Sequence, residues 1–231
     1  MNESGKCASV YKLYDWNQTG GTSVRAALAE LEVSFELVEI DFRSGAQFTD
    51  EYARINPRQQ VPSLELPDGS ILTENTAILM HLADTHPEAD LAPRSGTVER
   101  AQINRWLSFL AMNNYVAEYR RARPERYTTD SSSVQEVVDA ATVIVRHHYD
   151  IFEDAIGAGP YFLGDRFGIL DIYVWMLVQW WGDYDGMRRD YPKILRMVET
   201  VMDRPKIKPV HEEQFGPGLG IDRARYYGTR S

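Results

Sequence analysis

The chain has 231 residues with a hydrophobic share of 43%, which suffices for a packed core and for two domains. Its net charge of −9 argues against nucleic acid or an anionic membrane as a partner, and no apolar run is long enough to span a bilayer. Cys7 is the only cysteine, and no spacing of Cys and His residues is typical of a metal site, so we expect neither a disulfide within the chain nor a metal. Residues 1–9 contain no signal-peptide core, and we therefore expect a cytoplasmic protein.

The first segments predict a β-α-β unit. Residues 10–14 form a plausible strand, and residues 15–21 are a polar, glycine-containing loop. Val24, Leu28 and Leu31 then recur at helical spacing, and residues 35–40 predict a second strand.

Val61-Pro62 is followed directly by a hairpin pattern. Residues 63–66 alternate as a half-buried strand, residues 67–70 predict a turn, and a further strand begins at Ile71. Proline holds Val61 extended, which leaves the valine N–H and C=O available for another partner. This context favours a cis bond at Pro62, although most X-Pro bonds are trans.

A helix is predicted after Thr73. Its apolar stripe contains Ile78, Leu79 and Leu82, and its first turn exposes N–H groups that suit a carboxylate. Glu74 suits a ligand ammonium, and Asn75 adds polar contacts. An ordinary helix cap after a hairpin is the alternative.

The second half predicts helices throughout. Prolines and lost periodicity mark a linker at residues 87–96. Helices are expected over residues 98–121, from a capping box at residues 133–136 to residue 155, over residues 170–181, and from Pro192. The tail, residues 206–231, loses regular pattern and covers either a pocket or a neighbouring subunit.

These motifs resemble the cytosolic glutathione S-transferase superfamily, of a bacterial type with no assignable class. The resemblance rests on Val61-Pro62 with its hairpin, on residues 73–78 (TENTAI), on residues 24–30 (VRAALAE), and more weakly on residues 161–165 and 169–172. It implies an α/β thioredoxin-like N-terminal domain (βαβαββα) at residues 9–86, a linker at 87–96, an all-α helical bundle domain at 97–205, and a homodimer.

The resemblance also implies a glutathione site. The backbone of Val61 beside Pro62 would pair with the cysteinyl part of glutathione, and Glu74 with Asn75 would hold its γ-glutamyl end. Asn75 replaces the family's usual serine but keeps a donor and an acceptor. Further binding residues are expected at Asn17, Arg58 and Gln60, with Arg58 as a partner for the glycyl carboxylate.

The family places a Ser, Cys or Tyr in the loop before the first helix, where its hydroxyl or thiol acts on the glutathione sulfur. A gapless alignment puts this position on Gly20, and one deletion puts it near Gln18 or Thr19. Thr19 is the predicted hydroxyl donor, unless it only caps the helix. The alternative donors are Tyr14, Asn17, Thr22 and Ser23, and Arg25 either anchors an anion or forms a surface ion pair.

Tyr115 and Tyr119, four residues apart on one helix face, are predicted to line an electrophile pocket together with Trp16, although core packing is the commoner use of such aromatics. The implied function is a glutathione transferase that activates the glutathione thiol for attack on an apolar small-molecule electrophile. Other glutathione-dependent reactions (ether cleavage, dehalogenation, isomerisation, peroxide reduction) stay open, as does a non-catalytic glutathione-binding protein.

Overall fold

The computed structural model describes residues 10–220, and Cys7 lies outside them. Its sheet has four strands, β1 (Tyr11–Asp15), β2 (Phe35–Glu39), β3 (Ser63–Glu65) and β4 (Ile71–Thr73), in the order β2-β1-β3-β4. β1 runs parallel to β2 and antiparallel to β3, so Leu13 pairs with Leu37 on one side and with Leu64 on the other. This mixed sheet is the one expected from a β-α-β unit followed by a hairpin.

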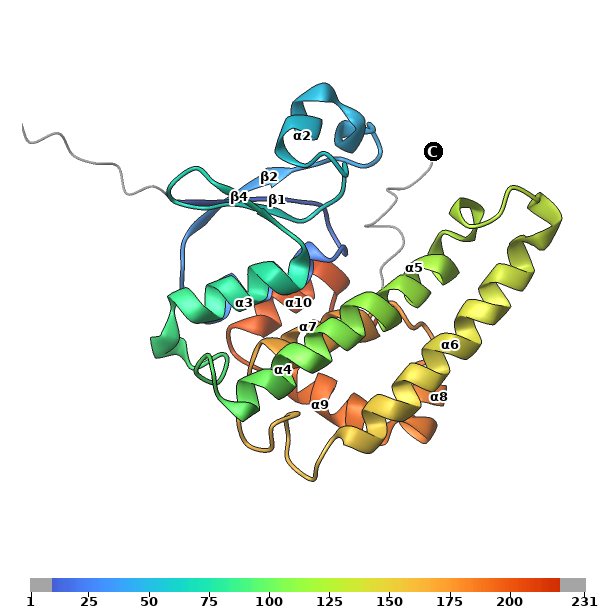
Figure 1. Ribbon diagram of the computed structural model, residues 1–231. Coiled ribbons are helices and arrows are strands. Elements are labelled where there is room, and N and C mark those ends of the chain that lie inside the picture. The colour runs from blue at the N-terminus through green and yellow to red at the C-terminus, as the bar shows by residue number, and fades with distance from the viewer. Residues whose placement is uncertain (1–9, 221–231) are drawn as a thin grey trace, which may run out of the picture.

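Three helices cover the sheet. α1 (Gly21–Glu30) and α3 (Asn75–Thr85) pack together on one face, while α2 (Asp50–Ile55) lies on the other (Figure 1). Alternation along β1 explains the division, because Leu13 and Asp15 are fully buried on the α1 and α3 face whereas Tyr14 points to the opposite side. The predicted order βαβαββα is therefore confirmed.

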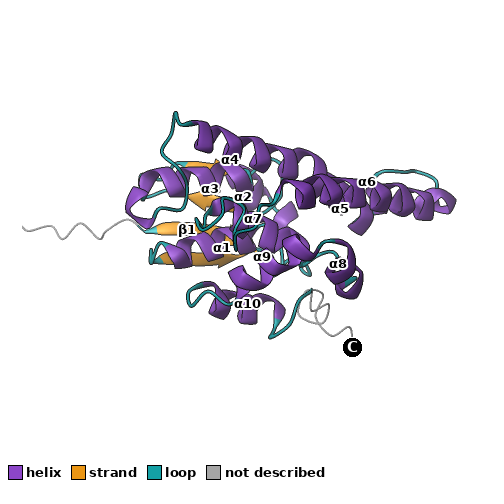
Figure 2. Ribbon diagram, turned by 90° about the horizontal axis from the view of Figure 1, so that it is seen from below, coloured by secondary structure: helices purple, strands orange, loops and turns teal. Residues whose placement is uncertain are grey.

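The second half is all helical, as predicted. Its long helices are α4 (Val98–Phe109), α5 (Tyr115–Ala122), α6 (Val134–Ala155), α7 (Ile169–Val178), α8 (Tyr184–Asp190), α9 (Pro192–Met202) and α10 (Ile207–Phe215). Every residue of α7 is buried, which places this apolar helix at the centre of the domain, where it also contacts α1 and α3 (Figure 2). The two domains thus share one packed interior.

The structure corrects the prediction of one continuous helix over residues 98–121. A π-helical segment, Leu110–Asn114, separates α4 from α5. Such a segment takes up an extra residue and changes the direction of every later side chain. The side chain of Asn114 is completely buried in this segment.

The N-termini of α6 and α7 differ in their capping. Ser133 makes no capping hydrogen bond to α6, because its hydroxyl donates to Asp130 at 3.1 Å, so the expected capping box is absent. At α7 the side chain of Asp171 caps the helix start: its carboxylate accepts the N–H groups of Gly168 and Phe162, each at 2.8 Å. Glycine at the cap position is therefore compensated by the aspartate.

The predicted irregular tail is wrong for its first part, because residues 207–215 form α10 and pack against α1. Its buried positions Ile207, His211, Gln214 and Phe215 follow helical spacing, but Pro209 and charged neighbours obscure that pattern in the sequence. Within residues 10–220, no helix combines the length and the apolar character needed to cross a membrane.

Candidate functional site

The peptide bond between Val61 and Pro62 is cis, as predicted. The carbonyl just before it, that of Gln60, accepts hydrogen bonds from the Tyr52 hydroxyl and the Asn56 side-chain amide, both at 2.7 Å. By contrast, no hydrogen bond joins the N–H or C=O of Val61 to any group in residues 10–220. Val61 therefore presents one backbone donor and one acceptor beside the cis bond.

α3 begins beside this bond. Glu74 precedes the helix with a φ of 66° and a ψ of 109°, a conformation that L-residues rarely adopt, and its side chain is exposed. No side-chain cap of the α3 N-terminus is present in the part of the chain that the structure describes, so the first N–H groups of α3 and its positive dipole end suit an anion. Arg58 Nη1 lies 3.6 Å from Glu74 Oε1, which places one cation and one anion at the edge of the site.

Asn75 turns inward. The Ser23 hydroxyl donates to Asn75 Oδ1 at 2.7 Å, and Asn75 Nδ2 donates to the Gly20 carbonyl at 2.5 Å. The side chains of Asn75 and Ser23 thus join α3 to the start of α1. The predicted binding residue Asn75 and the predicted catalytic residue Ser23 are therefore hydrogen-bonded to each other.

The Thr19 hydroxyl is also turned inward. It lies 2.7 Å from Asp15 Oδ1 and 2.9 Å from the Trp16 carbonyl, and it accepts the Gly21 N–H at 3.2 Å. Asp15 is completely buried, and that burial raises the pKa of its carboxyl group despite the Arg25 guanidinium at 2.8 Å. Thr19 therefore supports Asp15 and the helix start, and this placement does not favour a thiol donor.

Arg25 forms ion pairs, as one of the two alternatives predicted, but its side chain is buried rather than on the helix surface. Its Nε contacts Asp15, and its Nη1 lies 3.3 Å from Glu213 on α10. The side chain is almost fully buried, so it acts in the packing of α1 against α10.

Tyr14 lies on the α2 side of the sheet, away from the loop. Its hydroxyl donates to Glu65 Oε2 at 2.8 Å, and burial together with this bond raises the pKa of Tyr14 to about 12. This correction has a simple cause: successive side chains on a strand point to opposite faces, and Asp15 already occupies the α1 face.

Gly20 lies at the centre of the site. A β-carbon added at this residue would lie 3.2 Å from the Tyr115 hydroxyl, 3.1 Å from Asn75 Nδ2 and 3.5 Å from Pro62 Cδ. Tyr115 of α5 is thereby brought from the helical domain to the same point as the cis-proline and the start of α1. The sequence assigned Tyr115 to a pocket wall but gave no sign of this contact with Gly20.

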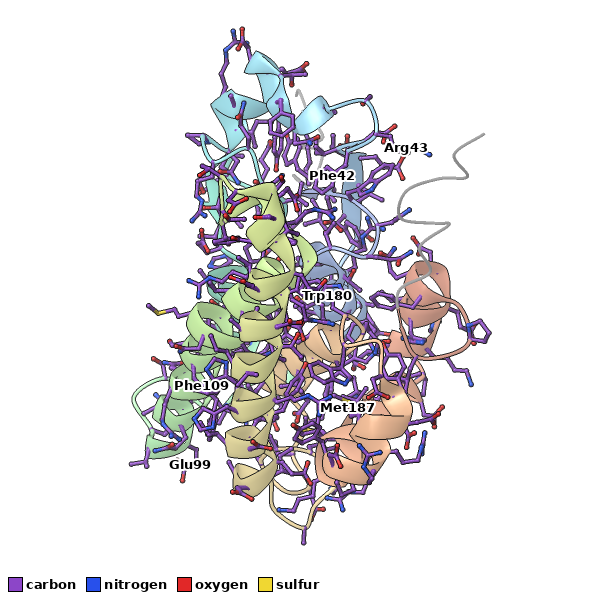
Figure 3. The ribbon with its side chains drawn as sticks, turned by 90° about the vertical axis from the view of Figure 1, so that its right-hand side faces the viewer. Phe42, Arg43, Glu99, Phe109, Trp180 and Met187 are labelled. Carbon is purple, nitrogen blue, oxygen red and sulfur yellow. The ribbon has the colours of Figure 1, made fainter. Side chains whose placement is uncertain are left out.

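Trp180 contacts both Tyr115 and the loop that contains Gln18. Its ring packs edge-on against Tyr115 with ring centres 5.1 Å apart, and its Nε1 donates to the Gln18 carbonyl at 3.2 Å. Trp180 is labelled in Figure 3. A single indole thus positions a tyrosine and the loop before α1.

Gln214 of α10 is a site residue that the sequence analysis missed. Its Oε1 accepts the Gln18 N–H at 2.9 Å and lies 3.4 Å from the Thr22 hydroxyl, while its Nε2 lies 3.3 Å from Asn17 Oδ1. Its side chain is completely buried. A buried glutamine in a segment with no recognised periodicity carries no local signal, so only the tertiary structure identifies it.

The other two predicted pocket residues lie elsewhere. Trp16 is buried, stacks on Phe42 with ring centres 6.3 Å apart, and lies under the Arg43 guanidinium (Figure 3). Tyr119 contacts Tyr127 and Arg126 near the end of α5. Of the three predicted electrophile-pocket residues, only Tyr115 reaches the cis-proline.

Taken together, the site presents an extended backbone edge, an open helix N-terminus, and an exposed pair of opposite charges. These features suit an extended zwitterionic peptide with carboxylate and ammonium groups. No group of three or more His, Cys, Asp or Glu side chains within residues 10–220 is arranged to hold a metal ion. The extended backbone, the helix N-terminus and the paired charges together favour the binding of a peptide.

Two family models match the chain. The model described as "Glutathione S-transferase, N-terminal domain" matches residues 9–84, and "Glutathione S-transferase, C-terminal domain" matches residues 135–206. Together they cover more than half of the chain, including the cis-proline, the α3 start and α7.

The similar curated proteins differ in their named activities. "Glutathione S-transferase GstA" of Escherichia coli O157:H7 is 26% identical over 78% of this chain and 87% of its own length. "Maleylacetoacetate isomerase" of Dictyostelium discoideum is 26% identical over 83% and 88%, and "Disulfide-bond oxidoreductase YfcG" of E. coli K12 is 25% identical over 84% and 90%.

Solved structures agree with these matches. A glutathione transferase homologue from Sulfitobacter, with bound glutathione, aligns with a TM-score of 0.80 and 29% identity over 89% of this chain and 98% of that chain. BphK, a bacterial GST in a ternary complex, aligns with a TM-score of 0.77 and 27% identity over 88% and 98%. The chain therefore belongs to the cytosolic glutathione S-transferase superfamily.

Proposed function

We propose that the protein binds reduced glutathione along cis-Val61–Pro62 and the start of α3, and that it activates the thiol for attack on an apolar electrophile. The observation that carries the proposal is that, within residues 10–220, the N–H and C=O of Val61 have no hydrogen-bond partner beside the cis-proline, next to a helix start with no side-chain cap. Similar structures that contain glutathione support the same assignment.

The cysteinyl backbone and each charged end of glutathione have a chemically complementary group in the site. The Val61 backbone would pair with the cysteinyl residue as a short antiparallel strand. The first N–H groups of α3 would hold the γ-glutamyl carboxylate, with Glu74 at the ammonium and Arg58 at the glycyl carboxylate. This orientation directs the thiol toward Gly20 and Tyr115.

In the proposed transfer, the glutathione thiol loses its proton to solvent and the thiolate sulfur forms a bond to an electrophilic carbon. A leaving group departs with the electron pair, or a conjugated double bond accepts it. Isomerisation and disulfide reduction start from the same bound thiolate, and both are named activities of similar proteins. Peroxide reduction, ether cleavage and dehalogenation stay within the same proposal as alternative second substrates.

Calorimetric titration of reduced glutathione tests the binding step. We expect saturable binding to the wild type and at least tenfold weaker binding to Glu74→Ala, which corresponds to about 1.4 kcal/mol. Glu88→Ala, an exposed glutamate at the domain linker, is the matched control and should bind as the wild type does. A folded wild type that does not bind glutathione would refute the proposal.

A substrate panel then separates the reactions. Turnover of an activated aryl halide supports transfer, turnover of a maleyl-type cis alkene supports isomerisation, and reduction of a glutathione mixed disulfide supports oxidoreductase activity. A protein that binds glutathione but turns over no member of the panel would favour a non-catalytic binding protein instead.

We also propose a homodimer. Exposed apolar side chains occur on α4, on the π-helical segment and on α6, where Val98, Met112 and Val143 are 74%, 74% and 67% exposed. Light scattering should give twice the chain mass of 26.5 kDa, and a Met112→Lys/Val143→Lys variant should shift toward that of one chain. A wild-type mass of one chain would contradict the dimer.

A further inference from the structure

We propose that the hydroxyl of Tyr115, delivered from the helical domain, stabilises the glutathione thiolate in place of a loop side chain. This inference rests on the proposed glutathione binding. It assigns the missing donor to a residue that lies 95 positions after the loop position, Gly20.

The geometry at Gly20 supports the assignment. A side chain beginning at this position would point into a space bounded by the Tyr115 hydroxyl, the Asn75 amide and the Pro62 ring. Since the cysteinyl residue would pair with Val61, directly before Pro62, its sulfur would enter this space. Glycine supplies no group of its own, so the neighbouring groups determine the chemistry of the sulfur.

Tyr115 is the only one of these three neighbours that carries a hydroxyl group. Asn75 Nδ2 already donates to the Gly20 carbonyl. Thr19 and Ser23, the nearby loop and helix hydroxyls, contact Asp15 and Asn75 respectively and point into the protein. The approach of the Tyr115 hydroxyl to within 3.2 Å of the Gly20 β-position therefore makes it the best-placed donor.

The surrounding structure fixes the direction of Tyr115. Trp180 packs against the tyrosine ring and donates to the carbonyl of Gln18 in the loop, so a movement of either partner would disturb the other. The π-helical segment Leu110–Asn114 ends immediately before Tyr115 and sets its angular position around the helix. The donor is therefore held rigidly, as electrostatic stabilisation of a developing charge requires.

The chemical step balances without another reactant. The thiol proton leaves to solvent, and the neutral Tyr115 O–H donates a hydrogen bond to the resulting thiolate without transferring its own proton. Because a hydrogen bond to the charged form favours that form, the pKa of the bound thiol falls. The thiolate then makes the S–C bond as described above.

The test measures the pKa of bound glutathione from the pH dependence of its thiolate ultraviolet absorbance. Tyr115→Phe should raise this pKa by at least one unit, about a tenfold loss of thiolate at a pH below the pKa. Calorimetric affinity for reduced glutathione below that pKa should change by less than about threefold, because the peptide contacts are retained. Tyr191→Phe, which removes a hydroxyl bonded to the Arg146 carbonyl far from the site, is the matched control with an unchanged thiol pKa.

A rescue variant makes the assignment specific. Gly20→Ser combined with Tyr115→Phe places a new hydroxyl in the space that the tyrosine hydroxyl has left, and it should restore the lowered thiol pKa. Where Tyr115→Phe does not fold, Gly20→Val covers the tyrosine hydroxyl with methyl groups and should produce the same rise in pKa.

The outcomes distinguish this inference from the proposed function. Glutathione binding with an unchanged thiol pKa in Tyr115→Phe or Gly20→Val would overturn the role of Tyr115 and leave the glutathione site intact. A wild type that binds no glutathione would refute both. A raised pKa in Tyr115→Phe that Gly20→Ser reverses would support the tyrosine as the donor.

Discussion

The side-chain oxygen of Gln214 accepts a 2.9 Å hydrogen bond from the backbone N–H of Gln18, a residue 196 positions earlier in the chain. Gln18 has a φ of 58°, in the left-handed region that costs a residue with a β-carbon roughly 1 kcal/mol or more. α10 thus stabilises an unfavourable backbone conformation in the loop that leads to Gly20. We regard Gln214 as a positioning residue.

Gln214→Met should test this relationship, because methionine has a similar size but provides no strong acceptor for the buried Gln18 N–H. An unsatisfied buried donor costs about 1–3 kcal/mol, so we expect the free energy of unfolding in urea to fall by that amount. Affinity for glutathione should fall as the loop relaxes, whereas the exposed control Gln102→Met should leave both quantities unchanged. Equal stability of the wild type and Gln214→Met would contradict a positioning role.

Gly20 and Gly21 are adjacent but should respond very differently to alanine. A β-carbon at Gly21 would lie 2.0 Å from Asp15 Oδ1, whereas the tightest contact at Gly20 is 3.1 Å. Gly21→Ala must displace the buried Asp15 and disturb its ion pair with Arg25, so we expect a loss of about 3–5 kcal/mol. Thermal unfolding should show Gly20→Ala close to the wild type, and a similar melting temperature for the two variants would show that Asp15 can move without cost.

Thr19→Val isolates the role of the threonine hydroxyl. The valine keeps the shape of the side chain but removes the bonds to Asp15 and from Gly21, so the free energy of unfolding should fall by about 1–3 kcal/mol. Thr19→Ser keeps the hydroxyl and should lose much less. The pKa of bound glutathione should stay at its wild-type value in both variants, and a rise in Thr19→Val alone would return Thr19 to the thiol chemistry.

Asp171 predicts a pH dependence of stability. Burial raises its pKa to about 7, well above the usual value of about 3.9, although two backbone N–H groups bind the carboxylate. Below pH 4 both the folded and the unfolded chain hold this proton. As the pH rises from about 4 to about 7, the unfolded chain releases it first, so the folded state loses stability over this interval.

The control for that effect is Asp171→Asn, which cannot titrate. Urea unfolding at several pH values should show that the stability of the wild type relative to Asp171→Asn is highest near pH 4 and declines toward pH 7. A difference that stays constant, or that grows with pH, would mean that the folded-state pKa of Asp171 is not raised.

The sequence predicted those helices and strands whose formation depends on residues close together in the chain. Alternation, turn residues and the Val61-Pro62 context were enough for the strands, the hairpin and the cis bond, and an apolar run was enough for α7. The π-helical segment was missed because an extra residue in one turn leaves the amphipathic stripe nearly intact on both sides. α10 was missed because its burial depends on α1, which is distant in sequence.

The site was predicted less completely because residue type does not determine direction. Thr19 and Ser23 are the expected kinds of residue in the expected place, but their hydroxyls donate to a buried carboxylate and to a partly buried amide. Tyr115 and Gln214 reach the loop only through tertiary packing. The alignment to Gly20 was informative, because it marked the position where no side chain exists and where neighbours approach.

The extra residue in the π-helical segment Leu110–Asn114 determines the direction in which the side chains of α5, including Tyr115, point. One residue turns an α-helix by about 100°, so deleting one residue between positions 110 and 114 would restore a regular helix and swing Tyr115 through roughly a quarter turn. The ring would leave Trp180 and Gly20 while the helix itself remained intact. A single-codon insertion or deletion in this turn is thus a simple way for evolution to bring a hydroxyl to the cis-proline or to withdraw it.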